Sequence, residues 1–344
     1  MRSRVLEDWI QNAGATLAWH ELGVSLPVTS SLASLPKAPC FITSPKIGWF
    51  DYAALETQHR PGLSWALRAM GRLADGMGLG HQCVVANFPV STNVWTPDEI
   101  KLIPALCERV VKDQPGRFVF VRNVHALHHA ELRQQLNTLG FYALPARVVY
   151  EFDLRDAVPK KSSQLMRDMK GRQQLDLHSE VLTAITLQEA GHLKALYDPI
   201  YLLKHGPFNA QYTPQFFADM VNAGSMSCLV LRSPSGEIRA FALLYQVGHT
   251  LTVPALGYAV DDASKGLYRA LFVDIFRHTL AHKLLLNFSS GAGDFKRKRG
   301  GQPHLEYTLV KPPVSRFHWK ARLFKRLERS SAGLSLEDLI AWGA

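Results

Sequence analysis

The segment from Leu251 to Gly301 constrains the fold of this chain more than any other. It is typical of a strand, a short loop, a long helix and a second strand: LTVPALGYAV, DDASKG, the helix over 265–282 and KLLLNFS. Leu267, Leu271 and Ile275 lie on one face of that helix. The second strand is short and continuously apolar, as expected in the middle of a sheet that is covered on both faces. A layered fold of sheet and helices is therefore predicted.

The same pattern of strands and helices runs through the rest of the chain. Thr96 and Glu99 form a capping box that predicts a helix to Lys112. Leu63, Leu67, Met70 and Leu73 have helical spacing. CFITS (40–44) is predicted to be a strand, and the first 35 residues a leader with weak helical periodicity. The fold class expected is α/β (α+β), with a mixed sheet and helices on both faces.

A length of 344 residues suits two domains of ordinary size. The boundary is placed near 155–163, where a charge run, a proline and two serines occur together. We therefore expect an N-terminal domain with its leader, a C-terminal domain and a basic amphipathic tail: 1–157, 158–313 and 314–344.

Charge and cysteine content limit the classes of partner and the compartment. Lysine and arginine number 39 against 29 acidic residues, a net charge of +10 that favours nucleotide phosphates, nucleic acid or a membrane surface. The excess is concentrated in 158–172, 294–301 and 311–329, and the tail suits a packed surface helix, an anionic bilayer or RNA. The four cysteines form no CxxC pair, the start lacks a secretory pattern and no apolar run suits a membrane span. A cytoplasmic protein is expected.

The loop before the predicted helix over 265–282 is a candidate anion site. A strand that leads through a short loop into a helix directs backbone N–H groups and the positive end of the helix dipole toward one place. Gly266 permits close approach, Ser264 suits a helix cap, and Lys265 and Arg269 add positive charge. Neither GxxxxGK[ST] nor GxGxxG is present, so an ordinary capped helix is the alternative.

The sequence LNFSSGAGDFKRKRGG gives a second candidate site. The predicted strand ends at Ser289–Ser290, and a glycine-rich turn with Gly291 and Gly293 follows. Asp294, Phe295, four consecutive basic residues and Gly300–Gly301 come next. Ligands in α/β sheets collect where strands end. A nucleic-acid-binding patch and a hydrated loop are the alternatives.

Together these two segments resemble the C-terminal part of the FemAB-like branch of the GNAT acyltransferase superfamily. The matching positions are Gly257, Tyr258, Ser264, Gly266, Leu267, Phe288, Gly291, Gly293, Asp294, Phe295, Lys296 and Gly300. The resemblance covers about residues 180–310 and implies two tandem GNAT-like domains, of which the C-terminal one is better preserved. It implies acyl transfer by direct attack, with acyl-CoA or aminoacyl-tRNA as the donor.

The resemblance and the placement of the residues give a candidate set. The catalytic candidates are Tyr258, Asp294 and Lys296. Those for the acyl-CoA donor are Val260, Ser264, Lys265, Gly266, Leu267, Tyr268, Arg269, Phe288 and Ser289. The candidates for contact with the acceptor are His205, Asn209, Tyr212 and Gly293. His278 and His282 have a spacing that suits a metal, but HExxH is absent and no carboxylate follows, so no metal is expected.

The function predicted from these observations is transfer of an acyl group from acyl-CoA to the amine of a small metabolite. Asp294 would attract or deprotonate the amine, Tyr258 would protonate the leaving group, and Lys296 would hold a phosphate or a carboxylate. Aminoacyl transfer from tRNA is the alternative enzyme. A catalytically inactive module that binds nucleic acid or a partner is the alternative outside enzymes.

Overall fold

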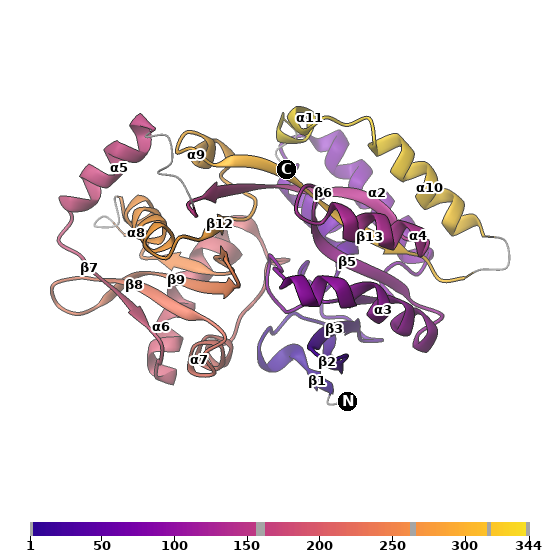
Figure 1. The fold of residues 1–344 in the computed structure, drawn as a ribbon, viewed down its shortest axis with the longest axis horizontal. Helices are drawn as coiled ribbons and strands as arrows, with labels where there is room; N and C mark the ends of the chain where they lie inside the picture. The colour runs from indigo at the N-terminus through magenta and orange to yellow at the C-terminus, as the bar shows by residue number, and fades with distance from the viewer. Residues whose placement is uncertain (1–2, 156–161, 262–265, 315–317, 342–344) are drawn as a thin grey trace. The chain divides into compact units, whose positions relative to one another are not determined.

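The structure, a computed structural model, describes residues 3–155, 162–261, 266–314 and 318–341. Its ribbon is drawn in Figure 1. The chain divides into two compact units, which are described separately here. Unit 1 consists of 1–148, 206–211 and 304–344, and unit 2 of 149–205 and 212–303.

Unit 1 contains a mixed sheet whose strands lie in the order β1-β2-β3-β4-β5-β13. The strands are β1 (Ser3–Val5), β2 (Ala15–Glu21), β3 (Ser25–Ser31), β4 (Gln82–Val85), β5 (Phe118–His125) and β13 (Gln302–Lys311). The pair β4 and β5 is parallel, and the crossover between them is α3 (Pro97–Asp113). The capping box of Thr96 and Glu99 that predicted this helix is present, with both reciprocal hydrogen bonds formed.

Helices cover both faces of the unit 1 sheet, and β5 shows how its residues alternate. Val119 and Val121 pack against α3 and α4 (Ala130–Thr138). Phe118 and Phe120 point to the other face. That face is covered by α2 (Pro61–Gly76) and α10 (Trp319–Ser331), which contribute Ala74 and Phe324 to its apolar cluster. The predicted tail helix therefore packs one apolar side chain into unit 1.

The α2 helix packs in the opposite sense to its sequence pattern. Its buried residues are the small ones, Ser64, Gly71 and Ala74. A Cβ on Gly71 would lie 3.1 Å from the Cβ of Phe50, so the helix is held close to its neighbour. The apolar residues Leu63, Met70 and Leu73 that predicted the helix are exposed. Helical periodicity correctly predicted a helix here, but it did not identify the face of the helix that packs.

Two expectations for the N-terminal region are wrong. Residues 15–31 form an antiparallel hairpin of β2 and β3 rather than a helical leader, with Gly23 in the left-handed region at the turn. Buried residues recur two apart on each half of β2, first Ala15 and Leu17 and then Ala18 and His20, which is the period of a strand. Residues 40–44 form turns rather than a strand, because the Thr43 hydroxyl and the Ser44 amide bond to nearby carbonyls.

In unit 2 the strands of the sheet lie in the order β12-β10-β9-β8-β7, with both parallel and antiparallel pairs. These are β7 (His178–Leu182), β8 (Ser227–Arg232), β9 (Ile238–Val247), β10 (Thr250–Thr252) and β12 (Leu285–Asn287). β11 (Leu256–Tyr258) pairs with β9. β6 (Tyr142–Asp153) begins in unit 1, and its last residues pair antiparallel with β12.

Helices lie on both faces of the unit 2 sheet (Figure 1). Ala240 and Ala242 of β9 pack against α8 (Leu267–Ala281), in a cluster that includes Phe272 and Phe276. The ring of Phe241, on the opposite face of β9, contacts Phe217 of α7 (Pro214–Asn222) at 5.6 Å. α6 (Leu187–Asp198) packs beside α7. The mixed sheet with helices on both faces, predicted from the order of elements, is confirmed.

The remaining elements are short or lie at the edges. They are the 3-10 turn Leu6–Asp8, the π-helical turns Ile47–Tyr52 and Pro199–Leu203, α1 (Ala53–Glu56), α5 (Ser163–Gln173), α9 (Gly293–Arg297) and α11 (Leu336–Ala341). Among the helices of the described residues, none combines the length and the apolar character that a membrane span requires.

The units differ from the linear division into 1–157, 158–313 and 314–344 because β13 pairs antiparallel with β5. This pairing returns the residues from 304 onward to unit 1. It was not visible in the sequence, because antiparallel pairing over such a distance leaves no local pattern.

Candidate functional site

The sequence 250–260, which was predicted to be one strand, is broken in the middle. β10 pairs parallel with β12, from Thr250 opposite Leu285 to Thr252 opposite Asn287. Pro254 follows and cannot donate to a ladder, because it has no N–H. β11 then continues on the far side of the break and pairs with β9, from Leu256 opposite Ala242. In the part of the chain that the structure describes, no pairing joins β11 to β12. The segment that contains β10 and β11 is therefore paired with β12 along β10 and separates from it beyond Pro254.

The turn after β12 brings a lysine back to the end of that strand. Ser289, Gly291 and Ala292 all have positive φ, which curls the chain tightly into α9. Lys296 of α9 is 3% exposed. Its Nζ donates to the carbonyl oxygens of Phe288, Ser289 and Ser290 at 2.6, 3.1 and 2.8 Å. A buried ammonium group is thus fixed at the carboxyl end of β12.

Asp294 lies on the outer side of the same turn. Its carboxylate pairs with Lys298 at 2.6 Å and Arg297 at 3.7 Å, and its side chain is 66% exposed. The hydrogen bond from Lys298 holds the pKa of Asp294 below its ordinary value of 3.8. At neutral pH the group is therefore an anion that can attract a cation, and it is a weak base.

A chain of aromatic contacts runs from the end of β11 to α9. The ring of Tyr258 lies 5.8 Å from that of Tyr268, on the first turn of α8, and Tyr268 lies 4.9 Å from Phe295. Burial raises the pKa of Tyr268 to about 12. It also raises the pKa of Tyr258, so that hydroxyl stays protonated at neutral pH and can donate a hydrogen bond.

The start of α8 is shifted relative to its prediction. The helix begins at Leu267, and Gly266 occupies the cap position with a φ of +94°. Ser264 and Lys265 lie outside the described residues, so their expected contacts are not described. Leu267 is buried at the helix start. Val260 and Arg269 are exposed.

Two buried ion pairs support this end of unit 2. Arg299 donates to Asp168 of α5 at 2.5 Å, with side chains 6% and 3% exposed. The Arg299 guanidinium also lies 3.5 Å from the centre of the Phe295 ring. Arg172, also on α5, pairs with Asp274 of α8 at 2.8 Å. α5 is thereby joined both to α8 and to the segment that carries Lys296.

Sequence reasoning did not find the role of Tyr150. This tyrosine of β6 is 1% exposed, and its hydroxyl accepts a hydrogen bond from Arg297 at 3.0 Å. A Cβ on Gly293 would lie 2.2 Å from the Tyr150 hydroxyl oxygen. Gly293, expected to contact the acceptor, therefore lets the turn close over Tyr150. Gly293 in the motif indicated a close approach at this position. The residue that approaches it, Tyr150, lies on β6, far away in the sequence.

Three other residues were expected to contact the acceptor: His205, Asn209 and Tyr212. Tyr212 is buried, with its ring stacked on that of Phe216 at 4.0 Å. Asn209 belongs to unit 1, where its carbonyl accepts a hydrogen bond from Asn12 at 2.9 Å. His205 belongs to unit 2. Their contact with an acceptor stays a prediction.

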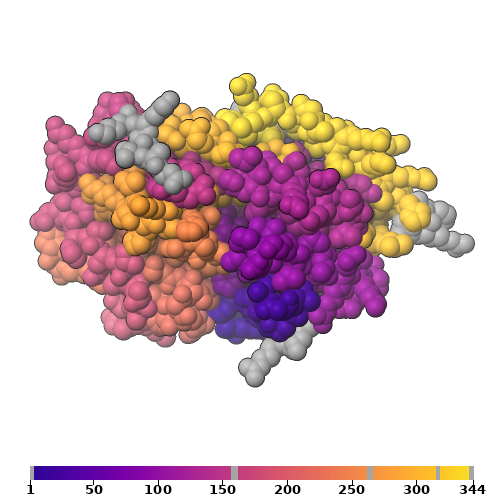
Figure 2. All heavy atoms as spheres, viewed as in Figure 1, coloured from indigo at the N-terminus to yellow at the C-terminus, as the bar shows by residue number. Residues whose placement is uncertain are grey.

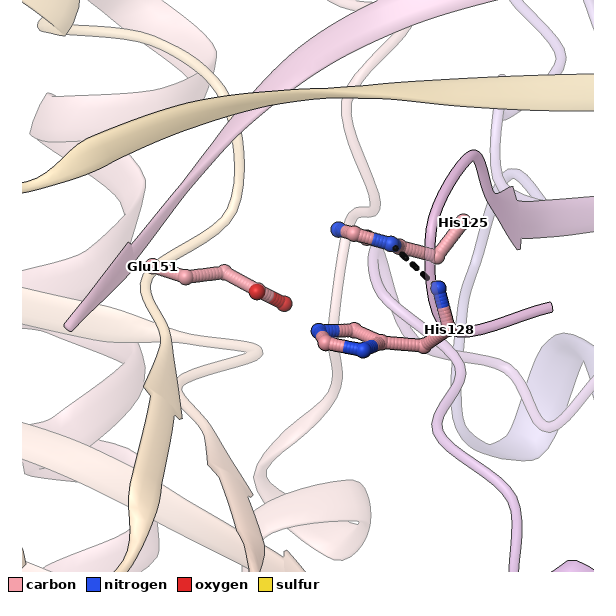
Figure 3. A group of neighbouring side chains, drawn as sticks. All are labelled: His125, His128 and Glu151. Carbon is pink, nitrogen blue, oxygen red and sulfur yellow. Dashed lines mark hydrogen bonds between the residues drawn. The ribbon is translucent and has the colours of Figure 1, made fainter. Parts of the chain in front are cut away.

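Histidines cluster in unit 1 rather than in the candidate site. Figure 3 shows the backbone N–H of His128 donating to Nδ1 of His125, at 3.1 Å. The Leu127 amide donates to the same nitrogen, and Nδ1 of His129 accepts from the His125 amide at 3.0 Å. Each of these Nδ1 atoms is therefore unprotonated. On α8 of unit 2, His282 and His278 contact through their rings. The expected absence of a metal stays a prediction.

We expect the buried, neutral His129 to make the fold less stable in acid. Burial lowers the pKa of His129 from 6.5 to about 4. As pH falls, the unfolded chain binds the proton first, so stability that is present above pH 6.5 is lost toward pH 4. The loss attributable to His129 is at most about 3 kcal/mol. Urea unfolding at about pH 7.5 and about pH 5 should show a smaller pH effect in His129→Asn, which keeps an acceptor without titrating. Equal pH effects in both proteins would contradict the assignment.

The fold can be compared with solved structures. No protein-family model matches the sequence, and no curated protein does. FemX aligns over 94% of this chain and 91% of its own, with a TM-score of 0.50 and 9% identity. The chain has the FemX-like fold. L-PGS from Bacillus licheniformis aligns over 72% of this chain and 82% of its own, with a TM-score of 0.52 and 17% identity. The C-terminal domain of a protein assigned as a lysylphosphatidylglycerol synthetase, from Agrobacterium fabrum, aligns over the same shares with a TM-score of 0.50 and 16% identity.

These likenesses agree with the resemblance drawn from the motif over 257–300. The expected architecture, a mixed α/β fold with helices on both faces of the sheet, is confirmed. At such low identity the comparisons establish the fold and leave the chemistry to be argued from the site.

Proposed function

We propose that this protein is an acyltransferase that moves an aminoacyl group from an aminoacyl-tRNA to an amine. The observation that carries the proposal is the separation of β11 from β12, together with what lies beside it. The rings of Tyr258, Tyr268 and Phe295 connect the end of β11 to α9. We infer that these rings narrow the space that the pantetheine arm of an acyl-CoA would need beside the end of β11. An ester at the end of a tRNA can instead approach from outside.

Three further features support this donor. The chain carries a net charge of +10, which favours a polyanion. The FemAB-like resemblance implies aminoacyl-tRNA for that branch. The Agrobacterium fabrum domain, whose fold is similar to this one, is named as part of a lysylphosphatidylglycerol synthetase, and FemX, also similar in fold, carries a Fem name.

The proposed chemistry needs few groups. The nitrogen of a neutral amine attacks the ester carbon, the C–N bond forms, and the C–O bond to the ribose breaks. The nitrogen loses a proton and the ribose oxygen gains one. We assign Tyr258 to donate at the leaving oxygen, because its raised pKa keeps it protonated. Asp294 would attract the cationic form of the amine.

Lys296 is assigned to stabilise the negative charge that develops on the carbonyl oxygen by its positive charge and not by a hydrogen bond, because its three N–H groups already donate to backbone carbonyls. Its ammonium group is buried, and burial strengthens its effect on nearby charge. Its three carbonyl partners hold it at the end of β12. A cation fixed before the reaction needs no reorganisation as the oxyanion forms.

We expect Lys296→Met to slow transfer by about a hundredfold or more. The measurement is transfer of radiolabelled amino acids from a mixture of charged tRNAs to a panel of small amines. Lys101→Met is the matched control, because Lys101 is an exposed lysine of α3 outside the basic runs and should leave the rate within about twofold. Circular dichroism should show that both variants are folded. A folded Lys296→Met variant that transfers at the wild-type rate would remove the assignment.

Acetyl-CoA is the second candidate donor, and one observation favours it. The exposed Gly266 precedes the first turn of α8 with a left-handed backbone, which suits a pyrophosphate near a helix start. Calorimetry with acetyl-CoA, in parallel with tRNA binding at increasing salt, separates the two donors. If acetyl-CoA bound and tRNA binding did not fall steeply with salt, acetyl-CoA would be the favoured donor.

A further inference from the structure

Unit 1 exposes large apolar side chains on a regular helix. Trp65 and Leu73 of α2 are 71% and 69% exposed, and Met70 is 49% exposed. The opposite face of the helix is closed by small residues, so the large side chains have no place in the core. Exposed apolar groups concentrated on one element mark a surface that contacts something other than water.

The neighbouring helix α10 carries positive charge on its outer face. Phe324 is buried against unit 1, and Glu328 accepts a hydrogen bond from the Ala143 amide at 2.7 Å. The opposite side of the helix carries only basic residues among its exposed charges: Arg322, Lys325, Arg326 and Arg329. An acid on α10 therefore faces inward while these four bases face solvent. Figure 2 shows α10, in yellow, at the molecular surface.

The two helices form one continuous face. Lys320 of α10 donates to the carbonyl of Met77, the residue that ends α2, at 2.8 Å. Phe324 and Ala74 belong to the same apolar cluster. Because both helices cover the same side of the unit 1 sheet, their solvent-exposed sides face in the same direction. α2 adds Arg68 and Arg72, which are also exposed.

We propose that this α2–α10 face, defined by the exposed residues of α2 and the outer bases of α10, binds the surface of an anionic lipid bilayer. Arginine and lysine side chains are attracted to anionic headgroups. Trp65, Met70 and Leu73 enter the boundary between headgroups and acyl chains, where large apolar side chains are favoured. An RNA would satisfy the bases but offers no apolar phase for these three side chains. The inference does not depend on the proposed transfer reaction.

Vesicle binding by the full chain tests the proposal. Flotation with vesicles of phosphatidylcholine and phosphatidylglycerol should recover the protein, whereas vesicles of phosphatidylcholine alone should recover far less. Two double variants should each lower the partition coefficient about tenfold or more: Trp65→Ser with Leu73→Ser, and Arg322→Glu with Arg326→Glu. Leu203→Ser is the matched control, since Leu203 is 83% exposed in unit 2. Its partition coefficient should not change.

A second measurement separates insertion from charge attraction. Brominated lipid should quench tryptophan fluorescence in the wild-type protein, and less so in Trp65→Phe. No binding to the anionic vesicles would overturn the proposal, as would binding that both double variants retain. The double variant Arg322→Glu with Arg326→Glu gives a further test. If it lost tRNA binding but kept vesicle binding, the proposal would also be overturned and the face would be assigned to RNA. Transfer assays without vesicles report on the proposed function separately.

Discussion

Replacing Gly257 with alanine is expected to destabilise unit 2 by about 3 kcal/mol or more. A Cβ at this position would lie 2.6 Å from both the carbonyl carbon and the carbonyl oxygen of Leu196, and 2.6 Å from the Phe241 ring. Two of these atoms belong to the backbone of α6, which cannot turn aside as the end of a side chain can. The helix and β11 would have to move apart, and the contacts between them would be lost.

Urea unfolding followed by circular dichroism measures this effect. Gly191→Ala is the matched control, because Gly191 also lies in unit 2, on α6 itself, and a Cβ there would meet nothing within 4 Å. Alanine is the better helix former, so this control should be unchanged or stabilised by up to about 1 kcal/mol. If both variants unfolded at the same urea concentration, the close approach of β11 to α6 would be incorrect.

Replacing Asp168 with alanine is expected to cost about 3–5 kcal/mol. The change leaves the Arg299 guanidinium buried without the carboxylate that it contacts at 2.5 Å. Arg299→Met should cost a similar amount, because it leaves Asp168 buried and charged. The double variant should cost much less than the sum of the two, since it removes both charges together.

An exposed pair provides the comparison for this cycle. Arg109 and Asp113, on α3, have side chains 50% and 53% exposed. Asp113→Ala should change stability by less than about 1 kcal/mol, because water screens the pair. Additive losses in the Asp168 and Arg299 cycle would show that the two groups do not act as a pair. Because Arg299 also lies over Phe295, we expect Asp168→Ala to reduce transfer beyond its effect on the folded fraction.

Much of the candidate site was visible in the sequence because its signals are local. The glycines of 291–293 predicted a tight turn after an apolar strand, and Gly291 does have positive φ. The motif that ends in Lys296 predicted a charged group at that strand's end. The structure changed its surroundings, since Lys296 is buried against three carbonyls rather than open to solvent.

Other features depended on neighbours that are distant in the sequence. The strand over 250–260 was predicted to be continuous. Its break at Pro254 became clear only from the pairing, because β10 pairs with both β9 and β12 whereas β11, among the described residues, pairs with β9 alone. The apolar residues of α2 predicted a buried stripe, but Ser64, Gly71 and Ala74 are the residues that pack. Helical spacing is a property of one segment, whereas the buried face depends on the shape of the surface opposite it.

The sequence by itself determined the alternation of strands and helices, the capped start of α3 and the turn that carries Asp294 and Lys296. These follow from hydrogen bonds and backbone preferences that act over a few residues. Only the tertiary structure decided that β13 returns to β5, that Asp168 pairs with Arg299, and that the rings of Tyr258, Tyr268 and Phe295 connect β11 to α9. Each of these contacts joins elements whose meeting depends on the packing of the whole unit, so no local pattern specifies it.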